Sequence, residues 1–366
     1  MFVELLELHN VRCHRGLLIE LNHSPVLLTG SNGVGKTSIL EAINIAAMSK
    51  SFLPVEDAEI VTHGAEGYYI RAHIRHDIGS EIDIVIEYQC SGTKRISTSA
   101  SGACSARDLI GLLPCVVLLS SQRDLFIGEP ALRRLFVDRI LSQSYTSYKH
   151  ALWRMRAALR QRNRLLSIGQ HGAELEAWTE ELLASSIELI TRRRSFVQQF
   201  NSILTDIIAT FLPSTLIPQI EYSIPWYHHD NHLISDDPGQ LADALRQYVR
   251  ELLPRDIERS STQWGPQRDV FTFMLGSNPL YAVASQGQQK IALFAVKLAE
   301  TSYLHRITDR TPVLLLDDVF SDLDRTNAQL VEMSILQMSN TWQIFVTAPH
   351  RDIISSAETF QIVTLG

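Results

Sequence analysis

The sequence has little of what marks several classes of protein. Its 366 residues contain only four cysteines, which form no CxxC pair and are too sparse for a disulfide framework: Cys13, Cys90, Cys104 and Cys115. No apolar run reaches the roughly 18 residues that cross a bilayer, and the first residues, MFVELLELHN, lack the features of a secretion signal. We therefore expect a cytoplasmic protein with no membrane association.

The chain also lacks an excess of positive charge. Thirty-three Lys and Arg against 40 Asp and Glu give a formal net charge of −7, which argues against a surface coated with basic residues. A local basic patch is still enough to neutralise phosphates, so nucleic acid is not excluded as a partner. The 45% of hydrophobic residues indicates a globular protein with a sizeable core, in one large or two ordinary domains.

The first third of the chain alternates strands with a helix. Residues 2–8 and 25–29 have the pattern of strands, and the second runs into a glycine loop that is followed by the helical run SILEAINIAAM. Residues 68–75 and 81–88 predict two strands of an antiparallel sheet, and the apolar run at 112–119 predicts another strand.

The middle of the chain has a different pattern. From about 130 to 210 the periodicity is helical with a break at 169–172, which predicts a helical hairpin. A strand near 218–226 and a helix near 238–253 follow, and 270–366 alternates β and α patterns. A polar cluster lies between this strand and this helix: His228, His229, Asp230 and His232. Such a cluster could suggest a metal site, but adjacent histidines seldom converge on one ion, so we expect a surface loop here.

The strongest motif is the segment GSNGVGKT at 30–37. Glycines let the backbone wrap closely around phosphates, and the N-terminus of the following helix favours an anion. In this pattern Lys36 reaches the β- and γ-phosphates and Thr37 ligates Mg²⁺. The sequence therefore predicts an ATP–Mg²⁺ site built from a loop and the start of its helix: Gly30, Ser31, Asn32, Gly33, Val34, Gly35, Lys36, Thr37 and Ser38.

A metal that bridges nucleotide phosphates also needs a carboxylate, usually at the end of a buried parallel strand. PVLLLDD at 312–318 has that form. Asp317 is the expected Mg²⁺ partner, and Asp318 is placed to act on the attacking water as a general base or orienting group.

Between these elements lies ASQGQQK at 284–290, directly before a long helical run. It resembles the signature motif of ABC-type ATPases, with Ser285, Gln286, Gly287 and Gln288 at a helix N-terminus. The alternative is an ordinary helix cap. The resemblance implies two chains packed head to tail with ATP between them, each signature completing the other chain's site. It also implies that Asp324 communicates across this interface and that Thr347 lies in a switch loop, with His350 either functional or an ordinary loop histidine.

Taken together, the segments of the chain resemble the RecF family of bacterial recombination-repair ATPases over essentially the whole length. The matching segments are HNVR at 9–12, GSNGVGKTSILEAI at 30–43, SF at 51–52, RRLFVD at 133–138, WGPQRD at 264–269, ASQGQQK at 284–290 and LLLDDVFSDLD at 314–324. The resemblance implies an α/β fold: an ABC-type ATPase head with a mixed P-loop sheet and an antiparallel β subdomain. It implies a head split between 1–122 and 262–366, with 123–261 as an inserted, mainly helical domain.

Some positions depart from the family pattern or match it weakly. Gln267 stands where the family has histidine, and LLSSQRDL precedes RRLFVD in place of a phenylalanine-and-proline stretch. Gln122 matches the glutamine that senses Mg²⁺ in related heads, or is an exposed loop residue. Arg12 matches a position near the nucleotide base.

A helix rich in arginine is the candidate DNA surface. Residues 139–173 contain no acidic residue, and Arg156, Arg160 and Arg164 recur every four residues, which places them on one helix face. Such a stripe suits phosphate contacts that do not read sequence. The alternative is a solvated helix whose arginines pair with the acidic residues of the next segment: Glu174, Glu176, Glu180 and Glu181.

The function implied by the resemblance is ATP-dependent DNA binding in recombination repair. ATP drives homodimerisation on DNA near gaps or duplex/single-strand junctions, slow DNA-stimulated hydrolysis releases the protein, and RecR and RecO act with it to promote RecA loading. One alternative is an ABC-type transporter subunit, which the long segment between Lys36 and Ser285 disfavours. A chromosome-maintenance head would need long heptad arms, which the chain lacks. A third alternative is an ATP-gated binding module with negligible hydrolysis.

Overall fold

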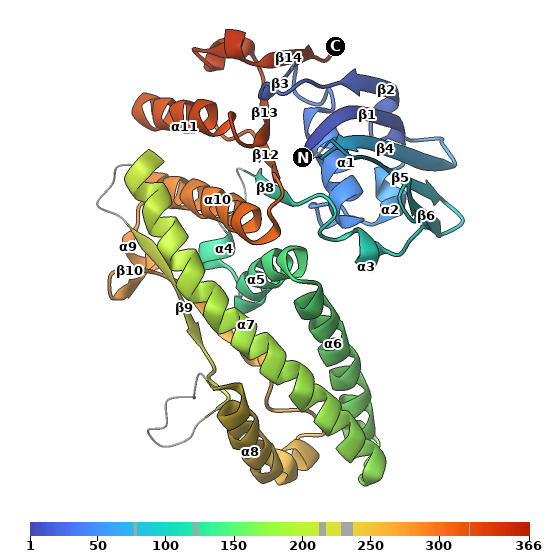
Figure 1. Ribbon diagram of the computed structural model, residues 1–366, viewed down its shortest axis with the longest axis vertical. Helices are drawn as coiled ribbons and strands as arrows, with labels where there is room; N and C mark the ends of the chain where they lie inside the picture. Colours follow the sequence, from blue (N-terminus) through green and yellow to red (C-terminus); the bar gives the residue numbers. More distant parts are fainter. Residues whose placement is uncertain (77–78, 120–121, 123, 212–216, 228–236, 322) are drawn as a thin grey trace. The chain divides into compact units, whose positions relative to one another are not determined.

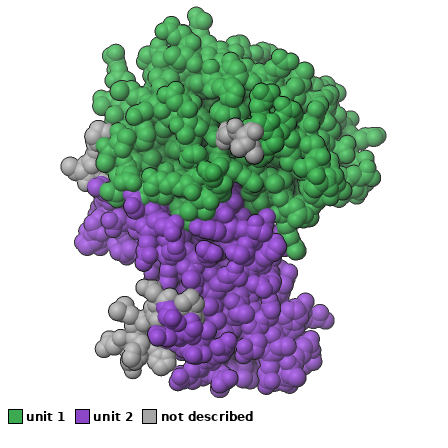
Figure 2. Space-filling model, viewed as in Figure 1, with its two compact units in different colours: residues 1–123, 203–215, 285–366 green, residues 124–202, 216–284 purple. Residues whose placement is uncertain are grey.

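The computed structural model describes residues 1–76, 79–119, 122, 124–211, 217–227, 237–321 and 323–366. The chain divides into two compact units, which Figure 2 shows in different colours. Unit 1 contains Met1–Arg123, Ile203–Thr215 and Ser285–Gly366, and unit 2 contains Asp124–Ser202 and Leu216–Ala284. In the described part of the chain, no helix is long and apolar enough to cross a membrane.

One sheet of unit 1 is antiparallel and has six strands in the order β2-β1-β4-β5-β6-β7 (Figure 1). Their bounds are β1 (Phe2–Val11), β2 (His14–Glu20), β4 (Gly67–Arg75), β5 (Glu81–Gln89), β6 (Thr93–Thr98) and β7 (Gly102–Ala103). Alternation sets the two faces: in β5, Ile82, Ile84 and Ile86 are buried while Glu81 and Glu87 are exposed.

The second sheet of unit 1 is parallel, with strand order β14-β3-β13-β12-β8. Its strands are β3 (Val26–Thr29), β8 (Cys115–Leu119), β12 (Val313–Asp317), β13 (Gln343–Ala348) and β14 (Gln361–Thr364). The three central strands and the edge strand β8 are buried almost throughout, as expected for parallel strands covered on both faces. Their carboxyl ends therefore meet along one edge of the sheet.

The helix α1 (Lys36–Met48) connects the two sheets. It contacts β1, β4 and β5 of the antiparallel sheet and β8, β12 and β13 of the parallel sheet, and all nine residues from Ile39 to Ala47 are buried. A buried pair of hydrogen bonds also joins the sheets, because the Gln343 side chain accepts from Val3 N–H and donates to Val3 C=O, both at 2.8 Å. The loop that precedes α1 is therefore held on a rigid core.

The remaining elements of unit 1 are mostly helical. They are α2 (Asp57–Ile60), α3 (Ala106–Leu109), α10 (Gln286–Thr308), α11 (Arg325–Met338), η2 (Arg351–Ile353) and η3 (Ala357–Thr359). Side-chain caps explain where two of the longer helices begin: Ser285 caps α10 and Asp324 caps α11.

Unit 2 is mainly helical, with a small antiparallel sheet in the order β11-β10-β9. Its elements are α4 (Asp124–Ile127), α5 (Pro130–Ser144), α6 (Thr146–Ser167), most of α7 (Ala173–Phe211), β9 (Pro218–Ser223), α8 (Pro238–Glu258), η1 (Pro266–Arg268), β10 (Val270–Leu275), β11 (Asn278–Pro279) and α9 (Leu280–Val283). The break at 169–172 separates α6 from α7, as the sequence predicts. The histidine-rich segment at 228–232, where we expect a surface loop, lies outside the described residues.

The observed division of the chain differs from the expected domain boundaries in two places. Residues 203–215 group with unit 1, and residues 262–284 group with unit 2. The second difference has a clear cause, because β10 pairs along its length with β9, from Val270 opposite Ser223 to Leu275 opposite Pro218. Strand pairing therefore keeps β10 within the inserted part of the chain.

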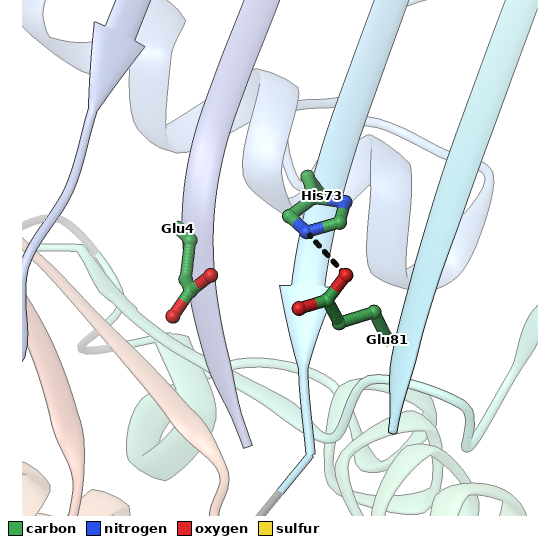
Figure 3. A group of neighbouring side chains, drawn as sticks. All are labelled: Glu4, His73 and Glu81. Carbon is green, nitrogen blue, oxygen red and sulfur yellow. Dashed lines mark ion pairs between the residues drawn. The ribbon is translucent and has the colours of Figure 1, made fainter. Parts of the chain in front are cut away.

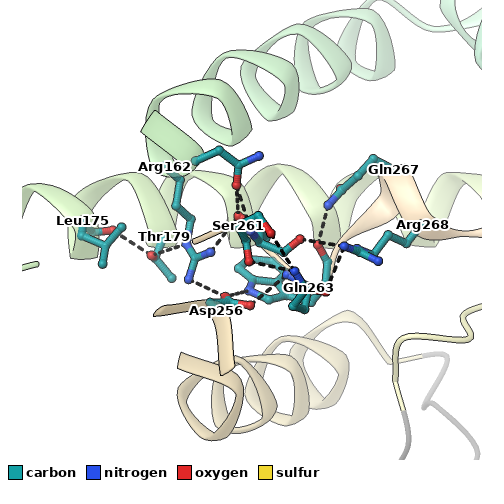
Figure 4. A network of polar contacts seen from close by, with 11 residues as sticks. Arg162, Leu175, Thr179, Asp256, Ser261, Gln263, Gln267 and Arg268 are labelled. Carbon is teal, nitrogen blue, oxygen red and sulfur yellow. Dashed lines mark hydrogen bonds and ion pairs between the residues drawn. The ribbon is translucent and has the colours of Figure 1, made fainter. Parts of the chain in front are cut away.

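Two buried arginines organise the polar contacts inside unit 2. Arg193 donates to Asp138 (2.9 Å) and Asp269 (2.6 Å), and Asp269 also accepts from Tyr222 and Trp226. Arg162 forms an ion pair with Asp256 at 2.8 Å and donates to Thr179 and Thr262, as the close view in Figure 4 shows for part of this network. Both arginine side chains are almost inaccessible to solvent.

Candidate nucleotide site

The predicted glycine loop lies between β3 and α1 at the carboxyl end of the parallel sheet. Gly30, Gly33 and Gly35 all have positive φ (146°, 86° and 100°), a region that favours glycine. The Lys36 ammonium donates to the carbonyls of Gly30 (2.6 Å) and Ser31 (2.9 Å), so its positive charge lies next to the backbone of the loop. This arrangement suits an anion.

Thr37 and Asp317 come together although they are far apart in the sequence. The Thr37 hydroxyl lies 3.0 Å from each oxygen of the Asp317 carboxylate, and Thr347 donates to the same carboxylate at 2.8 Å. Strand order explains this, because β13, which carries Thr347, lies between β3 and β12. Hydroxyl and carboxylate oxygens are the ligands that Mg²⁺ prefers, so this donor set fits the predicted metal.

The electrostatics of Asp317 favour the arrival of a cation. Burial raises the pKa of this carboxyl, and the neighbouring charge of Asp318 also raises it, against the lowering effects of Thr347, Thr37 and Lys36. Among the described residues, Asp317 forms no ion pair. A divalent cation would offset the cost of this buried charge.

Asp318 follows Asp317 directly in the chain. It is exposed, has a left-handed backbone conformation (φ 53°), and its N–H donates to the Thr347 hydroxyl at 2.9 Å. Among the described residues, Gln122 forms no hydrogen bond with either carboxylate, and its side-chain oxygen accepts from the N–H of Leu119, at the end of β8. Leu119 is itself the register partner of Asp317.

The four signature residues lie exposed at the start of α10. Ser285 and Gln288 form a capping box, because each side chain accepts a hydrogen bond from the backbone N–H of the other. At Gly287 an added Cβ would meet nothing within 4 Å, so its backbone is open to an approaching group. Among the described residues, none of the four hydrogen-bonds to the glycine loop of its own chain.

The other predicted site residues have varied surroundings. Asp324 caps α11 through Asn327, and these hydrogen bonds lower the pKa of its carboxyl. His350 is an exposed residue at the start of η2. Arg12 is held by a bidentate pair with the buried Glu41 (2.7 and 2.8 Å), a contact that no sequence motif indicates.

The arginines of α6 differ in burial and in whether they form ion pairs. Arg162 is buried, so it cannot contribute to an exposed stripe. Arg154 pairs with Glu181 and Glu188, and Arg156 lies 3.8 Å from Asp138. Arg160 and Arg164 are exposed and form no ion pair with the described residues. Pairing with the next helix therefore accounts for Arg154 but not for these two.

A second cluster, on the outer face of the antiparallel sheet, offers possible metal ligands. Glu4, His73 and Glu81 place one ligand atom each within 4.8 Å of the others (Figure 3). Arg75 already pairs with both carboxylates, at 3.1 Å to Glu4 and 3.2 Å to Glu81. An arginine in that place supplies the positive charge, so the cluster is an ion-pair network of the sheet.

Comparison with known sequences identifies relatives over the whole chain. Residues 2–365 match the family described as RecF/RecN/SMC N-terminal domain. The chain is 32% identical over 328 residues to the DNA replication and repair protein RecF of Chlorobaculum parvum, which covers 88% of each chain. It is also 32% identical over 362 residues to that of Salinibacter ruber, covering 96% of this chain and 85% of the relative.

Comparison with solved structures identifies similar proteins, as the sequence comparison does. The structure of the recombination mediator protein RecF-ATP in the RecFOR pathway has a TM-score of 0.86 and 25% identity, covering 96% of this chain and 94% of that one. The SmcHead bound to the C-winged helix domain of ScpA shares the fold, with a TM-score of 0.54 and 14% identity. The predicted ABC-type head is thereby confirmed. The chain belongs to the RecF family of SMC-like ABC ATPases.

Proposed function

We propose that this protein is an ATP-dependent DNA replication and repair protein that binds ATP with Mg²⁺, dimerises on DNA and uses slow hydrolysis to release it. The observation that carries the proposal is the convergence of Thr37, Asp317 and Thr347 beside the glycine loop. The names of its relatives, DNA replication and repair protein RecF, support the DNA and repair parts. The RecF-ATP neighbour supports the nucleotide.

Within one chain, each residue has a definite task. Lys36 and the loop N–H groups hold the phosphates, and Thr37 and Asp317 hold Mg²⁺. The metal, when bound, neutralises charge that develops on the phosphates. Thr347 keeps the Asp317 carboxylate oriented and also holds the backbone of Asp318. Asp318, exposed beside this centre, is placed to orient the attacking water or accept its proton.

Dimerisation follows from the signature residues. Ser285 and Gly287 are exposed at the N-terminus of a 23-residue helix, whose dipole favours an anion. We infer that the γ-phosphate they contact is bound by a second copy of the chain, packed head to tail. Asp324, at the start of the next helix, then lies where it can report nucleotide state across the interface.

DNA binding is assigned to the exposed arginines of α6, with Arg160 and Arg164 ahead of Arg156. Their free positive charges suit phosphate contacts at duplex, gapped or junction DNA. RecR and RecO are the proposed partners in promoting RecA loading, in keeping with the RecFOR pathway named for the structural neighbour. We propose that the protein acts in the cytoplasm.

The proposed function is tested by nucleotide-dependent assembly. ATP with Mg²⁺ should raise the dimer fraction in analytical ultracentrifugation, and Lys36→Met should abolish this response because it removes the charge that holds the phosphates. Lys50→Met, which removes an exposed lysine after the same helix, is the matched control and should respond as wild type does. Equal association of wild type and Lys36→Met, with or without ATP, would refute the model.

A second experiment separates the signature role of Ser285 from its capping role. Ser285→Asp keeps a good N-cap but places a negative charge where the partner's γ-phosphate should lie. The free energy of unfolding should stay within about 0.5 kcal/mol of wild type, whereas ATP-dependent dimerisation should be lost. Unchanged dimerisation would leave Ser285 with the capping role alone.

The alternative of an ATP-gated module with negligible hydrolysis is settled by turnover. Asp318→Asn suits the test because asparagine tolerates the left-handed backbone conformation of this position. Loss of phosphate release with retained ATP binding would support an ATPase with Asp318 in the chemical step. Equal and negligible turnover of both proteins, with and without DNA, would favour the gated module.

A further inference from the structure

The turn between β1 and β2 lies directly against the glycine loop. The Cys13 thiol donates to the carbonyl of Val34 at 3.5 Å, and Nε2 of His14 lies 3.1 Å from the carbonyl oxygen of Gly35. A carbonyl can only accept, so Nε2 of His14 must carry the hydrogen in this contact. Two consecutive carbonyls of the loop are therefore held by two consecutive side chains.

These contacts fix the direction of the next two N–H groups. In a trans peptide the C=O of one residue and the N–H of the next point to opposite sides of the chain. Holding the carbonyls of Val34 and Gly35 toward the turn thus directs the N–H groups of Gly35 and Lys36 away from it. Within the described chain, neither N–H donates to a protein acceptor. Both remain available to a phosphate.

The turn is firmly anchored, which allows it to act as a support. Arg12 forms the bidentate pair with Glu41 of α1, and its backbone N–H donates to Ile60 C=O at 2.7 Å. The Thr62 hydroxyl donates to Arg12 C=O, also at 2.7 Å. The support is therefore attached to the same helix that follows the glycine loop.

Close packing makes Gly35 necessary at this contact. A Cβ on Gly35 would lie 2.3 Å from Nε2 of His14 and 2.4 Å from the Cys13 sulfur, in addition to the cost of a positive φ. The absence of a side chain is what lets Cys13 and His14 reach the loop backbone.

We propose that His14, assisted by Cys13, is a positioning residue for the triphosphate: it holds the peptide planes of the glycine loop so that the N–H groups of Gly35 and Lys36 face the phosphates. This inference rests on the proposed ATP site. His14 does not touch the nucleotide in this role. It lowers the cost of ordering the loop when the phosphates bind.

The inference is tested with paired substitutions. His14→Phe keeps a ring against the loop but removes the donor, and His14→Gln restores an N–H at similar reach. In equilibrium titrations with a fluorescent ATP analogue, His14→Phe should weaken binding about 5-fold or more, and His14→Gln should recover most of that loss. The melting temperature without nucleotide should be the same for all three proteins. Equal affinity of wild type and His14→Phe, or equal loss in both variants, would overturn the inference.

The same titrations separate this inference from the proposed function. If wild type binds the analogue, Lys36→Met does not, and His14→Phe matches wild type, only the role of His14 fails. If wild type and Lys36→Met bind equally or not at all, the ATP site itself fails. Nitrogen chemical shifts of His14 in the nucleotide-free protein give an independent readout. They should show a hydrogen on Nε2, and a hydrogen on Nδ1 alone would contradict the contact.

Discussion

Asp317 in unit 1 is partly buried and Asp269 in unit 2 is fully buried, and burial raises the pKa of each. Their partners differ. Asp269 is surrounded by a guanidinium, a phenol and an indole N–H, from Arg193, Tyr222 and Trp226. Among the described residues, the Asp317 carboxylate accepts hydrogen bonds only from the hydroxyls of Thr37 and Thr347.

We interpret this difference as that between a structural carboxylate, Asp269, and the proposed metal ligand, Asp317. The network of Asp269 is closed, because its negative charge already has a positive partner inside the fold. The network of Asp317 is open, because its hydrogen-bond donors are neutral and no ion pair compensates it among the described residues. Buried charge without a counter-charge is costly, so such a site persists where a cation binds.

The largest expected effect comes from removing Arg193, the positive partner in the closed network. Arg193→Met leaves the buried Asp269 without its counter-charge and removes the arginine nearest to Asp138, from which Arg156 lies 3.8 Å away. The variant should lower the free energy of unfolding by about 3–5 kcal/mol. Chemical denaturation followed by circular dichroism measures this. Arg160→Met, an exposed arginine without an ion pair among the described residues, should change it by less than about 0.5 kcal/mol. Similar values for the two variants would contradict the closed network.

The next effect comes from removing the open charge. Asp317→Asn should weaken Mg²⁺-dependent ATP binding roughly 100-fold, equivalent to about 2.7 kcal/mol, because the metal loses its anionic ligand. Without nucleotide and metal, the same variant should be more stable than wild type by about 0.5–2 kcal/mol, as is common where a site gives up function. Titration calorimetry with and without Mg²⁺ and thermal denaturation provide the two measurements.

The pH dependence of this variant follows from the direction of the pKa shift. A carboxyl whose pKa is higher in the fold than in the unfolded chain favours folding when protonated. Wild type should therefore lose stability relative to Asp317→Asn as pH rises from the unfolded pKa through the folded one. A difference that is constant with pH would show that the charge of Asp317 is not the cause.

The comparison extends to cations on α6. Arg160 and Arg164 are open in the same sense, because they form no ion pair with the described residues. Arg154, in contrast, is paired with Glu181 and Glu188. Reversing both open arginines to Glu should weaken duplex binding about 10-fold and make the log–log salt dependence shallower by about 2. Arg154→Glu should have a smaller effect on both. Anisotropy titrations at several salt concentrations measure this, and equal effects would assign DNA binding to overall charge.

Sequence reasoning predicts the open site better than the closed one. GSNGVGKT and LLLDD carry chemistry in contiguous letters, and the order of parallel strands then brings Thr37 to Asp317. The burial of Arg162 and Arg193 has no such signal, because their carboxylate partners lie on distant segments and charged residues are expected outside. The hydrogen bond from His14 to the loop is equally hidden, since it depends on how closely two turns approach.

The smallest expected effect tests whether a buried polar atom of unit 2 lacks a hydrogen bond. The side-chain oxygen of Gln267 is buried and has no hydrogen-bond partner among the described residues, while its amide nitrogen donates to Trp264 C=O. Gln267→His removes the unsatisfied oxygen and retains a ring donor. It should stabilise the protein by about 0.5–1 kcal/mol in chemical denaturation. Gln263→His is the matched control and should destabilise it, because the Gln263 amide donates to Ser261 and accepts from Arg268. Destabilisation by both would mean that the Gln267 oxygen is satisfied, so that unit 2 has no polar defect at this position.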